Sequence, residues 1–290
     1  MKDFEYFSPT TVEEALSLLS KYKKEGKIIA GGQSMLVVMR QGLIAPEYII
    51  DIKGISALDY INYDQKDGLK IGALTTHRAI EKSPVLQKHF RVFSEMEVNL
   101  ATIQTRNWGT IGGNLCHGDP AGDPALVFIA LNAKLKLNRV GQERVVAMEE
   151  FSKDLLEVDL GADEMLTEIH VPIPKPYSGI AHEKLMMMQG DAGIVGAAVL
   201  ITMREGEDVC ESARIVISNA ASVPWRAKEA ENLLIGKRIN DTLLDKAGEI
   251  AAAKSDPPSD VHGSAEYRRE MIKVFVRRAG TKALERAKQG

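Results

Sequence analysis

The sequence predicts an α+β protein, and three observations support this prediction. Short apolar runs typical of strands recur along the chain, and stretches with helical periodicity lie between and after them. Three prolines interrupt regular structure and indicate a linker: Pro172, Pro174 and Pro176. A chain of 290 residues is long enough for two or three packed domains. We therefore expect three parts, at residues 1–56, 57–175 and 176–290.

The first part reads as a small strand–helix–strand unit. Thr11 and Glu14 have the spacing of a capping box, which predicts a helix from there to about Tyr22. The apolar residues of this helix fall on one face, namely Val12, Ala15, Leu16 and Leu19. Buried strands are expected at Ile28–Ala30 and Tyr48–Ile52.

The second part reads as a larger α+β unit and the third as a C-terminal α/β domain with an antiparallel sheet. Strands of the second part are expected at Leu58–Asn62, Leu69–Gly72, Ala133–Asn138 and Leu166–Val171. Its helices are expected at Thr76–Lys82, Val92–Leu100 and Pro124–Leu131. In the third part, strands are expected at Ala181–Leu185, Ile194–Met203 and Ala213–Ser218, followed by helices near 225–235, 241–254 and 265–288.

Residues 101–125, ATIQTRNWGTIGGNLCHGDPAGDPA, carry the most functional information. Gly112 and Gly113 let the backbone adopt positive φ and lie close against a ligand. Thr110 can cap a helix that starts there, so that several peptide N–H groups converge where a phosphate binds well. Asp123 and Pro124 read as the N-cap and first residue of the next helix. Read by itself, one glycine pair is an ordinary tight turn.

A second copy of this device occurs about 80 residues earlier, in IIAGGQSML at 28–36. Gly31 and Gly32 follow a short apolar strand, and Gln33 and Ser34 open the next turn. Two such loops can hold two linked phosphates between them, as in a dinucleotide. Neither loop has the glycine spacing of a Rossmann fingerprint, and neither is followed by the Gly-Lys-Ser/Thr of a phosphate-binding P-loop.

Composition excludes several classes of protein. A net charge of −3 gives no electrostatic footprint for nucleic acid. No apolar run approaches the ~20 residues of a membrane helix, and the N-terminus lacks a signal sequence, so we expect a cytoplasmic protein. The two cysteines, Cys116 and Cys210, are too few for an iron–sulfur cluster and read as small buried hydrophobes. Asp119 and Asp123 alone are weak evidence for a metal, and none is expected.

The two glycine motifs, AGGQSML at 30–36 and TIGGNLCHGDPAGD at 110–123, resemble those of a known family. This family comprises the FAD-binding, or medium, subunits of the molybdenum hydroxylases, which include aerobic carbon monoxide dehydrogenases and bacterial xanthine dehydrogenases. The resemblance also covers FEYFSPTTVEEAL at 4–16, RQGLIAPEYIIDI at 40–52 and SAEYRREMIKVFVRRA at 264–279.

The resemblance implies a two-subdomain FAD-binding fold of the vanillyl-alcohol-oxidase/PCMH type, followed by the family's C-terminal domain. It implies that FAD contacts Ile29, Ala30, Gly31, Gly32, Gln33, Ser34, Met35, Leu100, Thr110, Ile111, Gly113, Asn114, Asp123, Leu166 and Lys184. Lys184 would lie near the flavin ring. Leu100 stands where some relatives have an aromatic residue, so packing would replace stacking there.

The resemblance further implies a role in electron transfer. A molybdopterin-binding large subunit and a small subunit with two [2Fe–2S] clusters would be its partners. Two copies of each of the three chains would assemble. FAD would collect electrons from the clusters and pass them to an external acceptor. No residue of this chain is expected to be catalytic.

Several readings stay open at this level. Lys184 lies in a predicted strand, where lysines are usually solvated, and His117 reads as a surface residue or a proton-transfer group. The basic terminal helix has only three acids in 266–288 and reads as a solvated face or a docking surface. The alternative functions are a stand-alone flavoprotein oxidase and a nucleotide-binding regulatory module.

Overall fold

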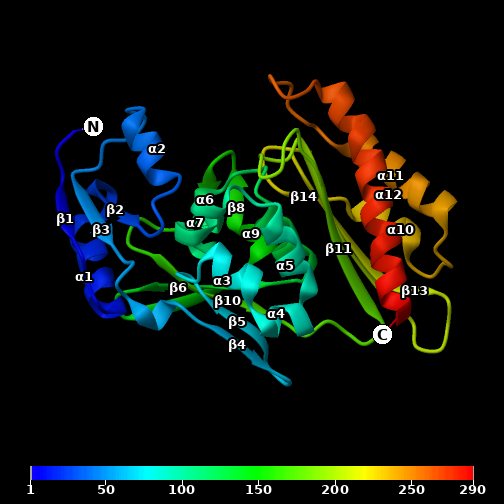
Figure 1. Cartoon of the computed structure of the whole chain (residues 1–290), viewed down its shortest axis with the longest axis horizontal. Coiled ribbons are helices and arrows are strands. Elements are labelled where there is room, and N and C mark those ends of the chain that lie inside the picture. The colour runs from blue at the N-terminus through cyan, green and yellow to red at the C-terminus, as the bar shows by residue number, and fades with distance from the viewer. Residues whose placement is uncertain (1, 290) are drawn as a thin grey trace.

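A computed structural model describes residues 2–289, and Figure 1 shows three units arranged side by side. The first unit has a parallel sheet of order β1-β3-β2, formed by β1 (Glu5–Phe7), β2 (Gly26–Ile29) and β3 (Tyr48–Asp51). Its helices are α1 (Val12–Tyr22), a 3₁₀ turn (Lys23–Glu25) and α2 (Met35–Arg40). The predicted helix and both predicted strands are confirmed, whereas β1 and α2 were not foreseen.

The N-terminus of α1 is capped almost as the sequence predicts. The Thr11 side chain accepts the N–H of Glu14 at 3.2 Å. The Glu14 carboxylate reaches back to the N–H of Thr10, one residue before the expected Thr11. The apolar face of the helix packs on the small sheet, with Ala15, Leu16 and Leu19 buried.

The second unit is built on a five-stranded antiparallel sheet of order β4-β5-β10-β6-β7. Its strands are β4 (Ile61–Asp64), β5 (Gly68–Gly72), β6 (Lys134–Arg139), β7 (Gln142–Ala147) and β10 (Met165–Val171), with a separate hairpin of β8 (Ser152–Asp154) and β9 (Glu157–Val158). Its helices are α3 (His77–Lys82), α4 (Pro84–His89), α5 (Arg91–Val98), α6 (Ile103–Trp108), α7 (Ile111–His117), α8 (Asp123–Ala130) and α9 (Met148–Phe151).

One prediction in this unit is wrong. Leu58–Asn62 is not a single strand, because residues Ser56–Leu58 form a 3₁₀ turn and β4 begins only at Ile61. The Leu58 carbonyl accepts the N–H of Leu74, which lies beyond the end of β5, so Leu58 is not part of the strand pairing between β4 and β5. The short helices α4 and α6 were also missed, because each has fewer than two turns of periodic signal, whereas the helix start expected after Thr110 is confirmed as α7.

The third unit has an antiparallel sheet of order β11-β12-β13-β14. Its strands are β11 (Ser178–Leu185), β12 (Val195–Met203), β13 (Cys210–Ser218) and β14 (Trp225–Arg226), and its helices are α10 (Lys228–Leu234), α11 (Asp241–Lys254) and α12 (Ala265–Gln289). The helix expected from residue 225 starts at Lys228, because Trp225 and Arg226 pair with β13 instead. The long α12 runs along the outer face of this sheet (Figure 1).

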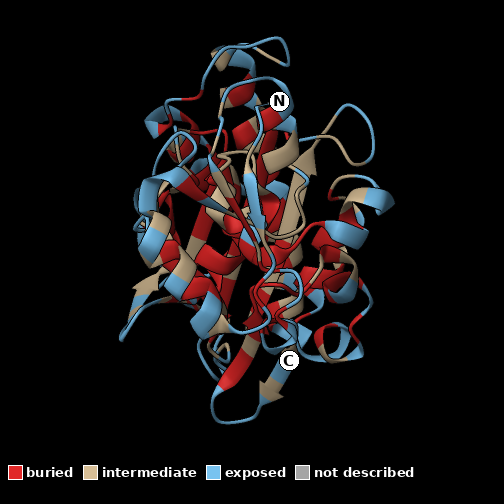
Figure 2. Cartoon of the chain, turned by 90° about the vertical axis from the view of Figure 1, so that its left-hand side faces the viewer, coloured by how far each residue is buried: buried red, intermediate tan, exposed pale blue. Residues whose placement is uncertain are grey.

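Helix α8 lies between the second and third units and explains how they join. All eight of its residues are buried, because it contacts α5 and α7 on one side and β12 and β13 on the other. The core of the second unit extends through α8 to Ala198 and Val216 of the third unit's sheet. Figure 2 shows buried residues through the interior of the chain. Within residues 2–289, no helix is long and apolar enough to cross a bilayer.

Candidate functional site

The fold brings the two glycine loops together. An added Cβ at Gly31, after β2, would collide with the Trp108 carbonyl and lie 2.8 Å from Gly109 Cα. Gln33 also lies over Gly109, with its Cγ 3.6 Å from the position of a Cβ there. The β2–α2 loop therefore packs on the junction between α6 and α7.

Within each pair the two glycines have different surroundings. Gly31 and Gly112 touch neighbouring backbone: a Cβ on Gly112 would lie 2.7 Å from both the carbonyl oxygen and the Cβ of Ala73. At Gly32 and Gly113 an added Cβ would instead meet side-chain atoms, with Leu36 3.2 Å from the Gly32 position and Thr110 Oγ1 2.9 Å from the Gly113 position. Gly32 also has φ +70°, which L-residues rarely adopt. The first glycine of each pair is needed for packing, and the second leaves its loop accessible.

The β2–α2 loop offers a run of free donors. Among the described residues, the peptide N–H groups of residues 31–35 donate to no protein acceptor. The left-handed Gly32 and the right-handed Ser34 (φ −93°, ψ −44°) sit within this run. Alternating backbone hands of this kind turn successive N–H groups toward one concave side, which suits an anion. Ser34 precedes α2 but makes no side-chain cap.

The second glycine loop differs from the prediction. Thr110 does cap α7, accepting the N–H of Gly113 at 3.2 Å. However, the N–H groups expected to converge on a phosphate are already paired: Ile111 donates to Thr75, Gly112 to Ala73, and Asn114 to Thr110. The antiparallel bridge between Thr76 and Thr110 takes up the Ile111 donor, and the Asn114 bond is an ordinary bond of α7. This loop is thus a rigid support, and the free donors lie in the β2–α2 loop.

Asp123 and Lys184 form a buried ion pair that joins the second unit to the third. Lys184 Nζ lies 2.7 Å from Asp123 Oδ2, and only 3% and 5% of the two side chains are exposed. The reading of Lys184 as a solvated strand residue is therefore wrong. Asp123 is not an N-cap either: Gly122 is the cap residue of α8, and Asp123 is its first helical residue. Its carboxylate points to β11 instead of its own helix.

A third residue, His182, completes this cluster. Its Nε2 lies 3.4 Å from Asp123 Oδ1. Burial alone would raise the pKa of Asp123, but the nearby His182 and the charge and hydrogen bond of Lys184 outweigh it and lower the pKa below its usual range. Asp123 Oδ1 is buried and has no hydrogen-bond partner among the described residues. Such an oxygen fits a hydroxyl group of a bound nucleotide.

Lys184 has no proton left for a ligand in this structure. Besides Asp123, it donates to the carbonyl oxygens of Asn99 and Asp191, each at 3.0 Å. These three acceptors match the three protons of an ammonium group. Lys184 consequently holds α8, the end of α5 and the β11–β12 loop together.

The remaining predicted site residues fall into two groups. Ile29, Ala30 and Met35 flank the free donors of the β2–α2 loop, and Asn114 lies between the loops and α8, its Oδ1 3.7 Å from the Cβ position of Gly122. In contrast, the side chains of Leu166 and Ile111 are buried in the hydrophobic core, so only their backbone can face a ligand. Leu100 is also almost fully buried and pairs with Gly190 of the β11–β12 loop.

Two further residues at this site were not predicted from the sequence. His182 was not singled out, although its place two residues before Lys184 puts both on one face of β11. Arg106 reads as an ordinary helix cation but is buried near the turn at Leu100. His117, the last residue of α7, is half-buried and makes no protein hydrogen bond among the described residues.

Both cysteines are unpaired and surrounded by apolar residues. Cys116 packs against the core of the second unit, and Cys210 is buried in the third. Burial raises the pKa of the Cys116 thiol to about 12 and that of Cys210 to about 11. Both are therefore neutral thiols at pH 7, in line with the prediction.

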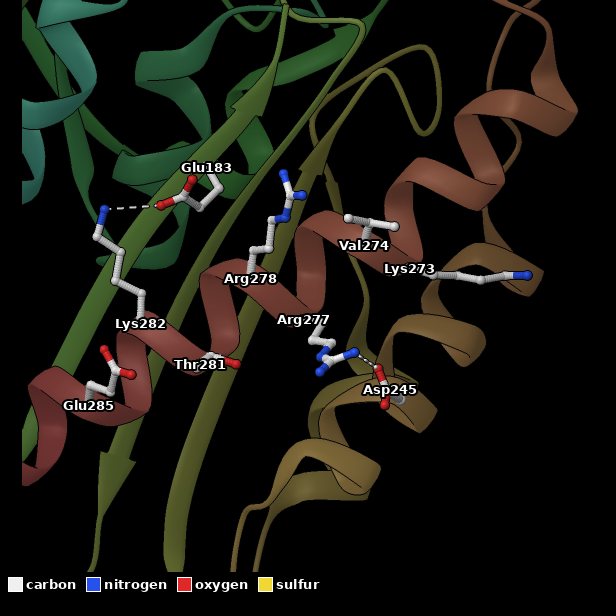
Figure 3. Close-up of a pocket in the computed structure, with 9 residues that line it drawn as sticks. All are labelled: Glu183, Asp245, Lys273, Val274, Arg277, Arg278, Thr281, Lys282 and Glu285. Carbon is white, nitrogen blue, oxygen red and sulfur yellow. Dashed lines mark hydrogen bonds and ion pairs between the residues drawn. The ribbon is translucent and has the colours of Figure 1, made fainter.

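The basic terminal helix α12 is largely neutralised within the chain. Its cations have the following acidic partners: Asp260 for Arg268, Glu270 for Lys273, Asp241 and Asp245 for Arg277, Glu183 for Lys282, Glu95 for Arg286 and Asp208 for Lys288. An open hollow of about 720 Å³ lies along this helix (Figure 3). Cations and acids both line it, and it contains none of the predicted FAD contacts.

The fold and the site define a class: an α+β protein with a loop of free backbone donors, packed on a second glycine loop, and a buried ion pair between Asp123 and Lys184. Comparison with known proteins makes this specific. The profile of the FAD-binding domain of molybdopterin dehydrogenases matches residues 2–174, and that of the carbon monoxide dehydrogenase flavoprotein C-terminal domain matches residues 181–283. The chain belongs to this family, the FAD-binding subunits of the molybdopterin-dependent dehydrogenases.

Individual relatives match over nearly the whole chain. The carbon monoxide dehydrogenase medium chain of Afipia carboxidovorans is 35% identical, covering 98% of each chain. An Escherichia coli K12 protein named as a putative xanthine dehydrogenase FAD-binding subunit is 28% identical, covering 99% of this chain and 98% of its own. Among solved structures, carbon monoxide dehydrogenase of Hydrogenophaga pseudoflava superposes with a TM-score of 0.94 at 33% identity, covering 98% of each chain.

Proposed function

We propose that this chain is the FAD-binding electron-transfer subunit of a molybdenum hydroxylase complex. It takes electrons from the [2Fe–2S] clusters of a small subunit and passes them to an external acceptor, while a molybdopterin-binding large subunit oxidises the substrate. Bound FAD supplies the chemistry, because it accepts electrons singly and releases them as a pair. The observation that carries the proposal is the run of free donors at residues 31–35 beside the second glycine loop.

The chain's own residues bind and orient the cofactor. The donors at residues 31–35 would hold the pyrophosphate, and Gly32 leaves room for its close approach. Asn114 and the free Oδ1 of Asp123 would take hydroxyl groups of the nucleotide. Lys184 would act through Asp123 and through the carbonyls it holds, since its three protons are already used.

We also propose the finer description of the fold. The first two parts, residues 1–56 and 57–175, would form a two-subdomain FAD-binding fold of the vanillyl-alcohol-oxidase/PCMH type, and residues 176–290 the C-terminal domain. The three larger sheets, one in each part, and the three hydrophobic clusters support this division. The expected assembly is a dimer of heterotrimers located in the cytoplasm.

FAD is expected to bind non-covalently. Each described cysteine is a neutral, apolar-packed thiol, which is a poor nucleophile for attachment to the isoalloxazine. Precipitating the yellow protein with acid should release all the flavin into the supernatant, where its absorbance is read. Yellow colour that stays with the pellet would contradict this prediction.

Electron entry is expected to need the iron–sulfur subunit. We would mix the three purified subunits, omit one at a time, and follow flavin bleaching after substrate is added. Omitting the small subunit should slow bleaching by at least about 10³-fold, since the chain has only two cysteines and cannot hold a cluster alone. Dithionite reduction of the same sample verifies that the flavin is intact.

The same experiment tests the alternative, a stand-alone flavoprotein oxidase. Bleaching of the isolated chain by substrate would require a substrate pocket and a base on this chain. That result would contradict electron entry through the iron–sulfur subunit and would support the stand-alone oxidase. A nucleotide-binding regulatory module would show neither bleaching nor a yellow colour on purification.

A further inference from the structure

The turn that follows α5 is held in an unfavourable backbone conformation. Ala101 has φ +46°, in the left-handed region that L-residues rarely adopt. The surrounding structure must therefore stabilise this turn, Asn99–Ala101. Two buried cations provide that stabilisation.

All three carbonyl groups of the turn accept hydrogen bonds from these cations. Arg106 Nη1 donates to the carbonyl oxygens of Leu100 at 2.7 Å and Ala101 at 2.8 Å. Lys184 Nζ donates to the carbonyl of Asn99 at 3.0 Å. Bonds from ionised donors are about twice as strong as neutral ones. The turn is thus fixed by hydrogen bonds at both ends, from Lys184 at Asn99 and from Arg106 at Leu100 and Ala101.

Each cation is itself oriented by a buried carboxylate. Glu81 Oε2 accepts from Arg106 Nε at 3.0 Å, and the two side chains are only 6% and 10% exposed. Burial alone would raise the pKa of Glu81, but hydrogen bonds from Arg78, Arg106 and Lys82 outweigh it and lower the pKa, so the carboxylate is ionised at pH 7. Asp123 plays the corresponding part for Lys184.

The turn also supports the β11–β12 loop. Gly190 pairs with Leu100, and an added Cβ on Gly190 would lie 2.7 Å from the Ala101 carbonyl oxygen. Lys184 holds Asp191 of the same loop. A change in the turn would therefore reach both this loop and the Lys184–Asp123 pair.

We infer that Arg106, oriented by Glu81, is a positioning residue of the FAD site that acts through the Asn99–Ala101 turn. The inference rests on the proposed function, in which Asp123 contacts FAD. Without the guanidinium the turn relaxes, Lys184 loses its fixed acceptor at Asn99, and Asp123 loses its orientation. Arg106 itself need not touch the cofactor.

The test compares Arg106→Lys with Arg226→Lys in the full chain. Arg226 is also a partly buried arginine bonded to a carboxylate: two bonds of 2.8 Å join it to Glu231 in the third unit, outside the proposed site. Both changes keep the positive charge and lose the planar guanidinium with its several donors. We expect Arg106→Lys to raise the Kd for FAD about tenfold or more and to change the visible circular dichroism of the bound flavin. Arg226→Lys should lower Tm and leave both flavin readouts unchanged.

A second substitution tests whether the turn is the route. Glycine adopts positive φ without strain, so Ala101→Gly added to Arg106→Lys should restore part of the lost affinity for FAD. Wild-type Kd and circular dichroism in a folded Arg106→Lys variant would overturn the inference, as would a double variant with no recovery. If Arg106→Lys does not fold, Glu81→Gln, which keeps the guanidinium, decides: a several-fold weaker Kd supports the inference and an unchanged one overturns it.

The outcomes separate this inference from the proposed function. A wild-type chain that binds FAD while Arg106→Lys binds it equally well would remove only the positioning role. A wild-type chain that binds no FAD would remove the proposed site and, with it, the inference.

Discussion

Lys184→Met is expected to lower the free energy of unfolding by about 3–5 kcal/mol, because it leaves the buried Asp123 carboxylate without its cationic partner. FAD binding should fall below detection, since Asp123 and the Asn99 and Asp191 carbonyls all lose their common donor. Urea unfolding gives the stability, and the ratio of flavin to protein absorbance gives the binding.

The loss of stability should depend on pH in a defined direction. In the wild type the pKa of Asp123 is lowered, so its contribution to stability is present above the ordinary pKa of about 4 and is lost as pH falls through the lowered value. In Lys184→Met the unpaired carboxylate destabilises the protein most at neutral pH and less once it is protonated. The difference in the free energy of unfolding between wild type and Lys184→Met should therefore become smaller from pH 7 toward pH 4.

Two further variants serve as controls. Lys175 makes an exposed pair with Glu211, so Lys175→Met should cost at most about 1 kcal/mol and leave FAD bound. Lys184→Met combined with Asp123→Asn removes both charges and should recover much of the stability without recovering FAD. A Lys184→Met protein with wild-type stability and flavin content would show that this pair has no role.

The glycine pairs are expected to separate folding from cofactor binding. Gly32→Val should keep a cooperative fold, losing about 1–2 kcal/mol for its positive φ, but retain less than about a tenth of the FAD. Gly113→Val should also keep a cooperative fold, because its Cβ would disturb only the Thr110 cap, 2.9 Å away. Its FAD content should fall as in Gly32→Val. Flavin content and urea unfolding are measured on the same samples.

Substitutions at the first glycine of each pair should be far more damaging. Gly31→Val and Gly112→Val place a side chain against backbone that cannot move aside, so little folded protein is expected. Gly141 is the matched control for Gly32: it has φ +70° with nothing within 4 Å of an added Cβ, in the β6–β7 hairpin. Gly141→Val should thus lose similar stability and keep FAD. Full flavin in Gly32→Val and Gly113→Val would show that the loops are ordinary turns.

The parts of the fold that the sequence predicted correctly depend on interactions local in the chain. The side chains of Thr11 and Thr110 each accept the N–H of the residue three positions later and so cap the helix that begins there. A threonine just before a helix start is visible in the sequence alone. The strands of the third unit were predicted from alternating residues at Ala181–Leu185, Ile194–Met203 and Ala213–Ser218, and each of these segments overlaps an observed strand. Family membership followed from the two glycine motifs, whose order and separation are also properties of the sequence.

The assignments that failed depend on partners distant in sequence. Asp123 was read as an N-cap, yet its carboxylate bonds Lys184, 61 residues later. The Gly112 donor was expected to be free, yet it bonds Ala73. Arg106 carries no local signal, and the only signal for His182 is its place two residues before Lys184. A side chain or peptide group bonds whichever partner the packed fold brings within about 3 Å, so only the tertiary structure decides which donors remain for the cofactor.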